Sequence, residues 1–435
     1  MLRSMFAAVS GLRSHQIMMD TVGNNIANVN TVGFKSSSTV FSDVLSQQLS
    51  GAGLPALGTV GGTNPRQLGL GVRLQAIQMN FTQGAAQLTG RSTDFSIQGD
   101  GLFVVNIAGT QAFSRAGSFS LDALGQLVTP DGGMVQGWSA TNGVVNTNGS
   151  VGTLRVPVGQ SIPATTTGSI KIGGNLPADA SDGTGTDPAT VLSSSIDVYN
   201  SLGTAIPIRV DYTKVPNGAG TVDWQVDAYD PDGNKIAGPM TLQFSQSNGE
   251  ITVPAGRSLN LTAAQLGNIK VGGSAPAGGW NTSGITLDFG SATAADRLTG
   301  AAKTNSVSAL SQDGAPLGTL VSFGVSQEGL ISGVFSNGKN EQLGQIALAA
   351  FTNPTGLEKL GGSLYRATVN SGAALIGTAG TGGRGTVSGG TVEMSNVDLA
   401  QEFTNLIVAQ RGFQANSRVI TASDEVLQDL VNMKR

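Results

Sequence analysis

The chain has 435 residues, of which 12% are charged, 63 are glycine and none is cysteine. This length suffices for about two to four domains, and the lack of cysteine excludes a disulfide framework or a thiolate metal site. A net charge of −4 without a basic cluster, together with 5% aromatic residues, argues against nucleic acid as a partner.

Residues 1–30 are predicted to form a helix with an apolar seam. The seam recurs at alternating spacings of three and four residues, at Leu2, Met5, Val9, Leu12, Gln16, Met19, Gly23 and Ile26. A 3.5-residue apolar repeat is typical of a coiled coil, which needs another helix to cover it. The Asn-rich run 23–30 is expected to end this helix, because asparagine is a weak helix former and a good cap.

Residues 31–70 are rich in Ser and Gly and are predicted to form an extended connector with room for one short helix. Alternating apolar and polar residues begin at about 71 and indicate strands. A hairpin is expected at 113–128 and a similar one at 322–331. Two related hairpins so far apart predict one inner β-domain, made of 71–145 and 285–370, that is split by an insertion.

The insertion, 146–284, is predicted to be an outer β-domain. Strand-like runs occur at 195–199, 206–212 and 222–229, followed by the turn 230–233. Their alternation favours a sandwich or a barrel with one face in water.

Residues 371–394 are glycine-rich and are expected to form a second extended connector, after which 395–435 form a helix with Asn396 as its N-cap. The seam of this helix, at alternating spacings of four and three, is Leu399, Phe403, Leu406, Gln410, Phe413, Ser417, Ile420, Asp424, Leu427 and Val431. The fold class is therefore mainly β with α-helical coiled-coil termini.

The two terminal helices are expected to pair with each other and then with other copies of the chain. Both adjoin flexible connectors, so no core of their own domain lies nearby to cover their seams. A lone helix of this kind is marginal in water, and we expect the termini to be disordered or partly helical in the monomer and to fold on assembly. The pattern predicts a subunit that polymerises.

Candidate sites for chemistry are weak. His15 has no second histidine or cysteine to complete a metal site. The run 333–340 lacks the Ser or Thr of a phosphate-binding loop and reads better as a hairpin turn. Four acidic residues, Asp223, Asp227, Asp230 and Asp232, lack the spacing of an EF-hand. We expect no catalytic residue, no cofactor and no metal.

Three segments resemble the end motifs of the bacterial flagellar rod and hook axial proteins. The N-terminal one is the run 24–35, and the C-terminal ones are 395–399 and 407–417; 81–103 is also similar to a stretch of the inner β-domain of these proteins. The residues that carry the motifs are Asn24, Asn25, Ala27, Asn28, Thr31, Gly33, Phe34, Asn396, Gln410 and Arg411. Within the family, the large insertion and the long connector look more like hook subunits than rod subunits.

The resemblance implies a homopolymer of many copies, a curved helical tube that acts as a flexible joint between rod and filament. It also implies rod proteins, the hook cap and the hook–filament junction proteins as partners, and unfolded export outside the cell through the flagellar type III apparatus. No cleavable signal peptide is evident near Met5 to Leu12, and no run approaches the roughly 20 apolar residues of a membrane helix. A distal rod protein and, in another class, a β-rich surface adhesin remain as alternatives. An enzyme fused to an axial protein would need a catalytic domain, for which we find no pattern.

Overall fold

The computed structural model describes residues 2–54, 61–141, 143–159, 161–217, 220–291 and 293–433. The chain divides into two compact units. The first unit comprises Met1–Pro157, Phe323–Gly333 and Glu341–Arg435, and the second comprises Val158–Ser322 and Val334–Asn340.

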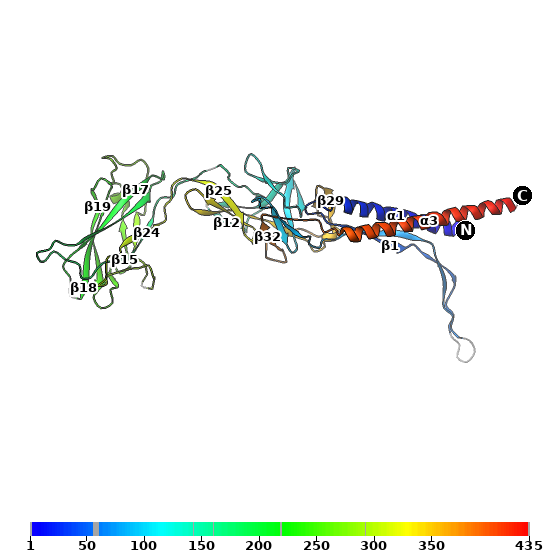
Figure 1. Cartoon of the computed structure of the whole chain (residues 1–435), viewed down its shortest axis with the longest axis horizontal. Coiled ribbons are helices and arrows are strands. Elements are labelled where there is room, and N and C mark those ends of the chain that lie inside the picture. The colour runs from blue at the N-terminus through cyan, green and yellow to red at the C-terminus, as the bar shows by residue number, and fades with distance from the viewer. Residues whose placement is uncertain are drawn as a thin grey trace. The chain divides into compact units, whose positions relative to one another are not determined.

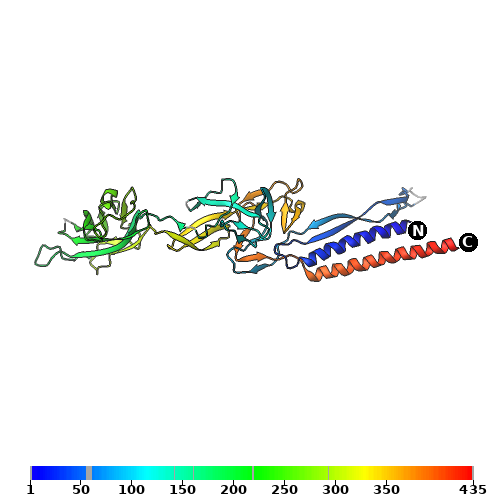
Figure 2. The ribbon, with the colours of Figure 1, turned by 90° about the horizontal axis from the view of Figure 1, so that it is seen from above.

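The first unit contains two long helices, α1 (Leu2–Ala27) and α3 (Leu399–Met433), so the expectation of disordered or partly helical termini in the single chain is wrong. They lie side by side in both views (Figure 1, Figure 2). Asn25 of α1 donates to Oε1 of Glu402 at 3.0 Å, and a Cβ atom at Gly11 would lie only 2.8 Å from Nδ2 of Asn416. The late part of α1 thus meets the early part of α3, so the helices are antiparallel and pack closely where a glycine faces a larger side chain.

The N-cap of α3 differs from the prediction. Oδ1 of Asp398 accepts hydrogen bonds from the backbone N–H groups of Ala400 and Gln401, at 2.9 and 3.2 Å. Asp398 therefore caps the helix, whereas Asn396 binds the preceding segments of the chain.

The predicted connector 31–70 is wrong in its secondary structure. Instead of an extended segment with a helix, the chain forms a two-stranded ribbon, as β1 pairs with β4 and β2 with β3. The strands are β1 (Ser37–Asp43), β2 (Ser46–Ser50), β3 (Arg66–Gly69) and β4 (Val72–Met79). Part of the ribbon packs on α1, where the ring centroids of His15 and Phe41 lie 6.3 Å apart. The pairing was missed because each strand finds its partner beyond the Ser/Gly-rich stretch.

The rest of the first unit is the inner β-domain, which both flanks of the insertion build, but the predicted bounds are wrong, because residues 146–157 belong to the first unit and residues 285–322 to the second. β11 pairs with β27 and β7 with β28, which joins residues near 105 and 137 to residues near 346. Its elements are β5 (Ala86–Leu88), β6 (Phe95–Gln98), β7 (Leu102–Ile107), β8 (Thr110–Ser114), β9 (Ser120–Leu121), β10 (Leu127–Val128), β11 (Met134–Thr141), β12 (Val144–Val145), β13 (Gly152–Thr153), β27 (Asn340–Ile346), β28 (Leu348–Ala350), η1 (Pro354–Gly356), β29 (Glu358–Gly361) and β30 (Leu364–Arg366).

The predicted connector 371–394 also belongs to this domain. It contains β31 (Leu375–Gly377), β32 (Thr386–Gly389) and β33 (Thr391–Glu393), which pair with β28, β6 and β5. These short strands lie between glycines that conceal their alternation, so they are recognisable only by their partners.

The second unit is a sandwich of two five-stranded sheets, which decides between the sandwich and the barrel. One sheet has the order β16-β17-β18-β19-β20, and the other contains β21, β22, β15, β23 and β24. The elements are β14 (Ser161–Ile162), β15 (Ser169–Asn175), β16 (Val191–Tyr199), β17 (Ala205–Lys214), β18 (Thr221–Tyr229), β19 (Lys235–Ser245), β20 (Ile251–Val253), β21 (Ser258–Leu261), α2 (Ala263–Leu266), β22 (Ile285–Asp288), β23 (Leu298–Thr299) and β24 (Ser308–Gln312). Two further strands, β25 (Gly318–Val325) and β26 (Leu330–Phe335), run across the boundary of the units.

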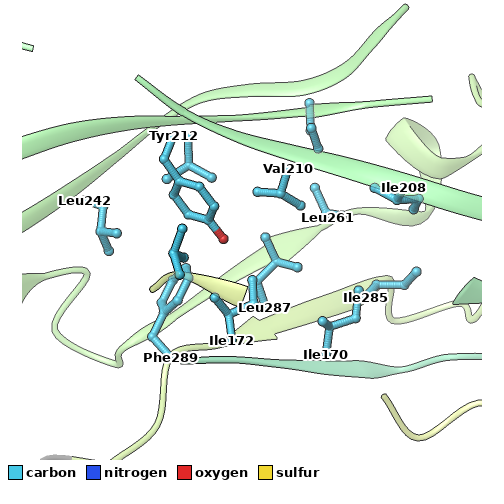
Figure 3. Packing of buried hydrophobic residues seen from close by; sticks show 14 of the residues in the cluster. Ile170, Ile172, Ile208, Val210, Tyr212, Leu242, Leu261, Ile285, Leu287 and Phe289 are labelled. Atoms are coloured by element: carbon cyan, nitrogen blue, oxygen red, sulfur yellow. The ribbon is translucent and has the colours of Figure 1, made fainter. Parts of the chain in front are cut away.

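The core of the second unit lies between its sheets. Val210 and Tyr212 of β17 face Ile172 of β15 and Leu287 of β22, and all four are at most 2% exposed (Figure 3). Each such aliphatic side chain stabilises the fold by about 1.5–3 kcal/mol. The alternation in β17 puts these residues on the inner face, so this unit covers its own apolar surface.

Candidate polymer interface

The predicted seam of α1 does not coincide with the side of the helix that is most buried within the chain. Met5, Leu12, Met19 and Ile26 are half-buried, and Val9 is exposed. The side chain of Leu2 lies outside the described residues. The buried positions of α1 are small or polar and are Ala8, Gly11, Ser14, Val22 and Asn25. Small side chains allow α3 to approach closely on this side.

On α3, one column of the predicted seam faces the inside of the pair and the other does not. Leu406, Phe413, Ile420 and Leu427 are half-buried, while Leu399 is 40% exposed. In the second column Phe403 and Val431 are exposed by 51% and 68%. The positions that meet α1 beside the first column are instead those of Glu402, Ala409 and Asn416.

A further apolar stripe on α3 was missed by the sequence reasoning. Its members are exposed and are spaced by seven, four, three, four and seven residues: Val408, Ala415, Val419, Ala422, Val426 and Met433. We call this set the outer stripe. The spacing of seven was visible in the sequence, but the stronger Leu and Phe column, which lies on another side of the helix, drew the assignment. Antiparallel pairing with α1 leaves the outer stripe uncovered in a single chain.

The ribbon also presents apolar side chains to solvent. Leu45 lies between β1 and β2, Leu49 is in β2, and Leu54 is 94% exposed. All described residues of β2 and β3 are exposed. A two-stranded ribbon is marginally stable by itself in water, so this part needs a partner surface.

The N-terminal motif joins α1 to the ribbon and to the inner β-domain. Asn25 is fully buried and exchanges two hydrogen bonds with the backbone of Ser37, at 2.8 and 3.0 Å. Asn28 donates to Asn24 and accepts from the Thr31 hydroxyl. Ala27, an exposed residue, is the last of the helix.

The next motif positions lie against the β-domain. Gly33 has φ +67°, and a Cβ atom there would lie 2.4 Å from the backbone N of Ala116, so a larger residue would be strained and obstructed. The ring of Phe34 lies beneath the Lys359 ammonium at 4.8 Å. Burial lowers the pKa of Lys359.

In the C-terminal motif, Asn396 links its own segment of the chain to two others. It accepts from the backbone N–H of Ser36 at 2.8 Å and donates to the carbonyls of Asn80 and Thr82. Gln410 and Arg411 are exposed on α3. The motifs thus contain both internal anchors and exposed helical positions.

A buried ionic cluster close to both motifs was not anticipated. Glu393 accepts from the Lys35 ammonium at 2.7 Å and from the Arg115 guanidinium, and the three side chains are at most 4% exposed. Burial lowers the pKa of Lys35, while contact with Glu393 opposes that shift. A possible signal was the charged Arg115 inside the apolar hairpin 113–121, where an unpaired charge would be costly.

The residues considered above for phosphate or metal binding take part in turns, hydrogen bonds and ion pairs of the fold. The run 333–340 forms the predicted turn, with Gly338 at φ +77° between β26 and β27. Asp230 accepts from Asn234 and Lys270, Asp232 accepts from two glycine N–H groups, and Asp227 pairs with Lys235. Among the described residues there is no group of three metal-ligating side chains, and no helix has the length and apolar character needed to cross a membrane.

Known protein families match consecutive parts of this chain. The family described as "Flagella basal body rod protein" matches residues 5–35, and "Flagellar basal body rod FlgEFG protein C-terminal" matches 388–433. "Flagellar hook protein FlgE/F/G D1 domain" matches 96–175, and "Flagellar basal body protein FlaE D2 domain" matches 174–315.

Whole proteins from three bacteria are similar along their full length. The "Flagellar hook protein FlgE" of Treponema pallidum is 38% identical, with all of both chains covered. That of Escherichia coli is 33% identical over 98% of this chain and 99% of the relative. The "Flagellar basal-body rod protein FlgG" of Bacillus subtilis is 30% identical, again over all of both chains.

Proposed function

Because this chain belongs to the flagellar hook protein family, we propose that it works by polymerising through its terminal helices and its ribbon. It is a structural subunit of the bacterial flagellar hook and a polymeric component of the flagellum. We propose that its polymer is a curved tube that acts as a flexible joint and transmits torque from the rod to the filament.

The observation that carries the mechanism is the outer stripe of α3. Val408, Val419 and Val426 are 42–55% exposed, although each apolar side chain would stabilise an interface by about 1.5–3 kcal/mol if fully buried. A soluble helix normally turns its apolar side towards its own core. An apolar stripe outside a helix pair that already covers a first one fits contact with further copies.

We propose that the subunit-interface residues predicted from the sequence act together with the outer stripe. Val9, Phe403 and Val431 are exposed and would contact neighbouring copies directly. The half-buried residues would hold α1 and α3 together, which presents the outer stripe. The ribbon, with Leu45 and Leu49 exposed, would extend the same interface.

We also propose four structural domains for the subunit in the polymer. They are the terminal helical domain (1–30 and 395–435), the ribbon (37–79), the inner β-domain (86–157, 323–333 and 341–394) and the outer β-domain (158–322 and 334–340), with bounds that follow the two compact units. The helical domain would form the inner wall of the tube. The Gly/Ser/Thr-rich surfaces of the β-domains would form outer layers that slide as the tube bends.

The proposed partners follow from a position between rod and filament. They are rod proteins, the hook cap, the hook–filament junction proteins and the type III export apparatus. We propose export outside the cell in an unfolded state without removal of a signal peptide. The lack of cysteine supports this, since no disulfide has to form afterwards.

The distal-rod and adhesin alternatives are not favoured by the set of relatives. Electron microscopy of basal bodies from cells that lack this chain distinguishes all three. We expect a complete rod with no curved segment and no filament. A truncated rod would assign the chain to the distal rod, and normal flagella would favour the adhesin.

The interface is tested by the double variant Val419→Asp and Val426→Asp in the full-length chain. Both positions are exposed, so the monomer should retain its circular dichroism, whereas charges in the stripe should prevent tube formation. The matched control is the double variant Gln414→Asp and Thr421→Asp, which adds the same two charges, also seven residues apart, at exposed positions outside the stripe. Normal tubes from the double variant would refute the role of the outer stripe.

A further inference from the structure

The ionic cluster of Lys35, Arg115 and Glu393 joins four segments that are far apart in the sequence. Oε1 of Glu393 accepts from Nζ of Lys35 at 2.7 Å and from the backbone N–H of Gly84 at 2.8 Å. Lys35 also donates to the carbonyl of Thr82 at 2.7 Å. One carboxylate therefore holds together the segment after α1, the segment between β4 and β5, and the segment before α3.

Arg115 fixes this carboxylate to the inner β-domain. Its Nε donates to Oε2 of Glu393, and Nη2 donates to the carbonyls of Ile97 and Gly99 at 3.0 and 2.6 Å. A guanidinium bound on several sides is a rigid donor, because its planar fork loses little freedom for each bond. These contacts form a continuous path from the inner β-domain, through Arg115 and Glu393, to Lys35 in the segment after α1.

We propose that Glu393 is a positioning residue that sets the orientation of the terminal helix pair on the inner β-domain. This inference rests on the proposed function, because a fixed orientation lets each subunit present its outer stripe at the same angle and pass load to the β-domain. Nearby, Gly33 donates to the carbonyl of Glu393 at 2.8 Å, so the backbone of the same residue also holds the chain that leaves α1.

The charges of the cluster indicate which variant tests this role. The native cluster has two buried cations and one carboxylate, so Glu393→Gln would leave two cations without a carboxylate partner and would unfold the region. Lys35→Met instead leaves the Arg115–Glu393 pair balanced. It removes the link to the segment after α1 and keeps the attachment inside the β-domain.

The experiment is segment-resolved hydrogen exchange on the full-length, unpolymerised chain. For Lys35→Met we expect amides of α1 and β1 to exchange at least about tenfold faster, with β7, β8 and the second unit unchanged. The matched control is Glu358→Gln, which breaks the exposed pair of Glu358 and Arg366 at 2.7 Å and should change none of these rates.

Two results would overturn the inference. Unchanged exchange in α1 would show that the cluster does not hold the helices, and equal acceleration of α1, β7 and β8 would show that it only stabilises the domain. If Lys35→Met does not fold, Lys35→Gln, which retains an N–H donor for Glu393, is judged by the same criteria. A positioning role further predicts that hooks made from the variant bend more than wild-type hooks in electron micrographs.

The exchange experiment is independent of the proposed function. It is carried out on the free chain, so its outcome stands even if cells lacking this chain make normal flagella. Conversely, suppose that Lys35→Met forms hooks that bend as wild-type hooks do and shows unchanged exchange rates. That result would refute the positioning role and leave the hook function intact.

Discussion

The terminal helix pair and the second unit differ in how far they bury their apolar side chains. In the second unit, Val210, Trp224 and Leu287 are at most 2% exposed between two sheets. In the helix pair, Val419 and Val426 are more than 40% exposed. A region that covers its own apolar surface can fold alone, whereas the helix pair has surface left for other copies. We propose that this difference separates the part that contacts other copies from the part that the assembly carries.

The largest expected effect comes from charges in the predicted seam. Leu406→Asp with Phe413→Asp should abolish polymerisation, because both residues are half-buried beside α1 and a carboxylate there would separate the helices. Circular dichroism should still show folded β-domains, and electron microscopy of the assembly reaction should show no tubes. Intact tubes from this variant would refute the claim that polymerisation depends on the helix pair.

A cavity in the second unit tests the other side of the comparison. Leu287→Ala should destabilise this unit by about 2–5 kcal/mol, because a fully buried side chain is removed from a packed core. The loss of stability is measured by urea unfolding of the full-length chain, with hydrogen exchange of the β15 and β22 amides as the readout for the second unit. Tubes should still form under native conditions, and a failure to polymerise would mean that the two regions are not independent.

Loss of Asn25 should have an intermediate effect on the helix pair. Asn25→Ala removes the hydrogen bonds to Ser37 and Glu402 and should destabilise the attachment of α1 by about 1–3 kcal/mol. Faster amide exchange at the end of α1 would record this. Asn24→Ala, at an exposed position, is the control and should have a smaller effect.

The smallest predicted effect is a loss of stability of the first unit at alkaline pH. Burial raises the pKa of Tyr365 to about 12, whereas the unfolded value is about 10. The unfolded state therefore releases this proton first, so stability falls as pH rises from 10 to 12, by about 1 kcal/mol at pH 11. Tyr365→Phe should lose less stability than the wild type between pH 8 and pH 11. An equal loss in both would contradict the assignment.

Much of the fold follows from local patterns. The strands over 195–199, 206–212 and 222–229 were predicted from alternation, and the turn at Gly338 from its Asn-Gly pair. The split inner β-domain also followed, from two similar hairpins. These features are local, since alternation and turn chemistry act within a few residues.

Other features depended on partners distant in the sequence. The ribbon 37–79 and the short strands within 371–394 were wrong or missing, because each depends on a neighbour that no local window contains. The cap was misplaced although its partners are local, since Asp398 rather than Asn396 accepts from Ala400 and Gln401. The ionic cluster is the extreme case, as Lys35 and Glu393 stand near opposite ends of the chain.

The sequence by itself determined that both ends are helices with apolar seams, that the middle is β, and that the end motifs resemble those of axial proteins. Heptad spacing and alternation suffice for this, because they set which side of an element is apolar. Only the tertiary structure decided which side of α3 faces α1 and which side stays exposed. That choice depends on the small residues Ala8 and Gly11, which allow close packing on one side, and such a preference exists only once two surfaces meet.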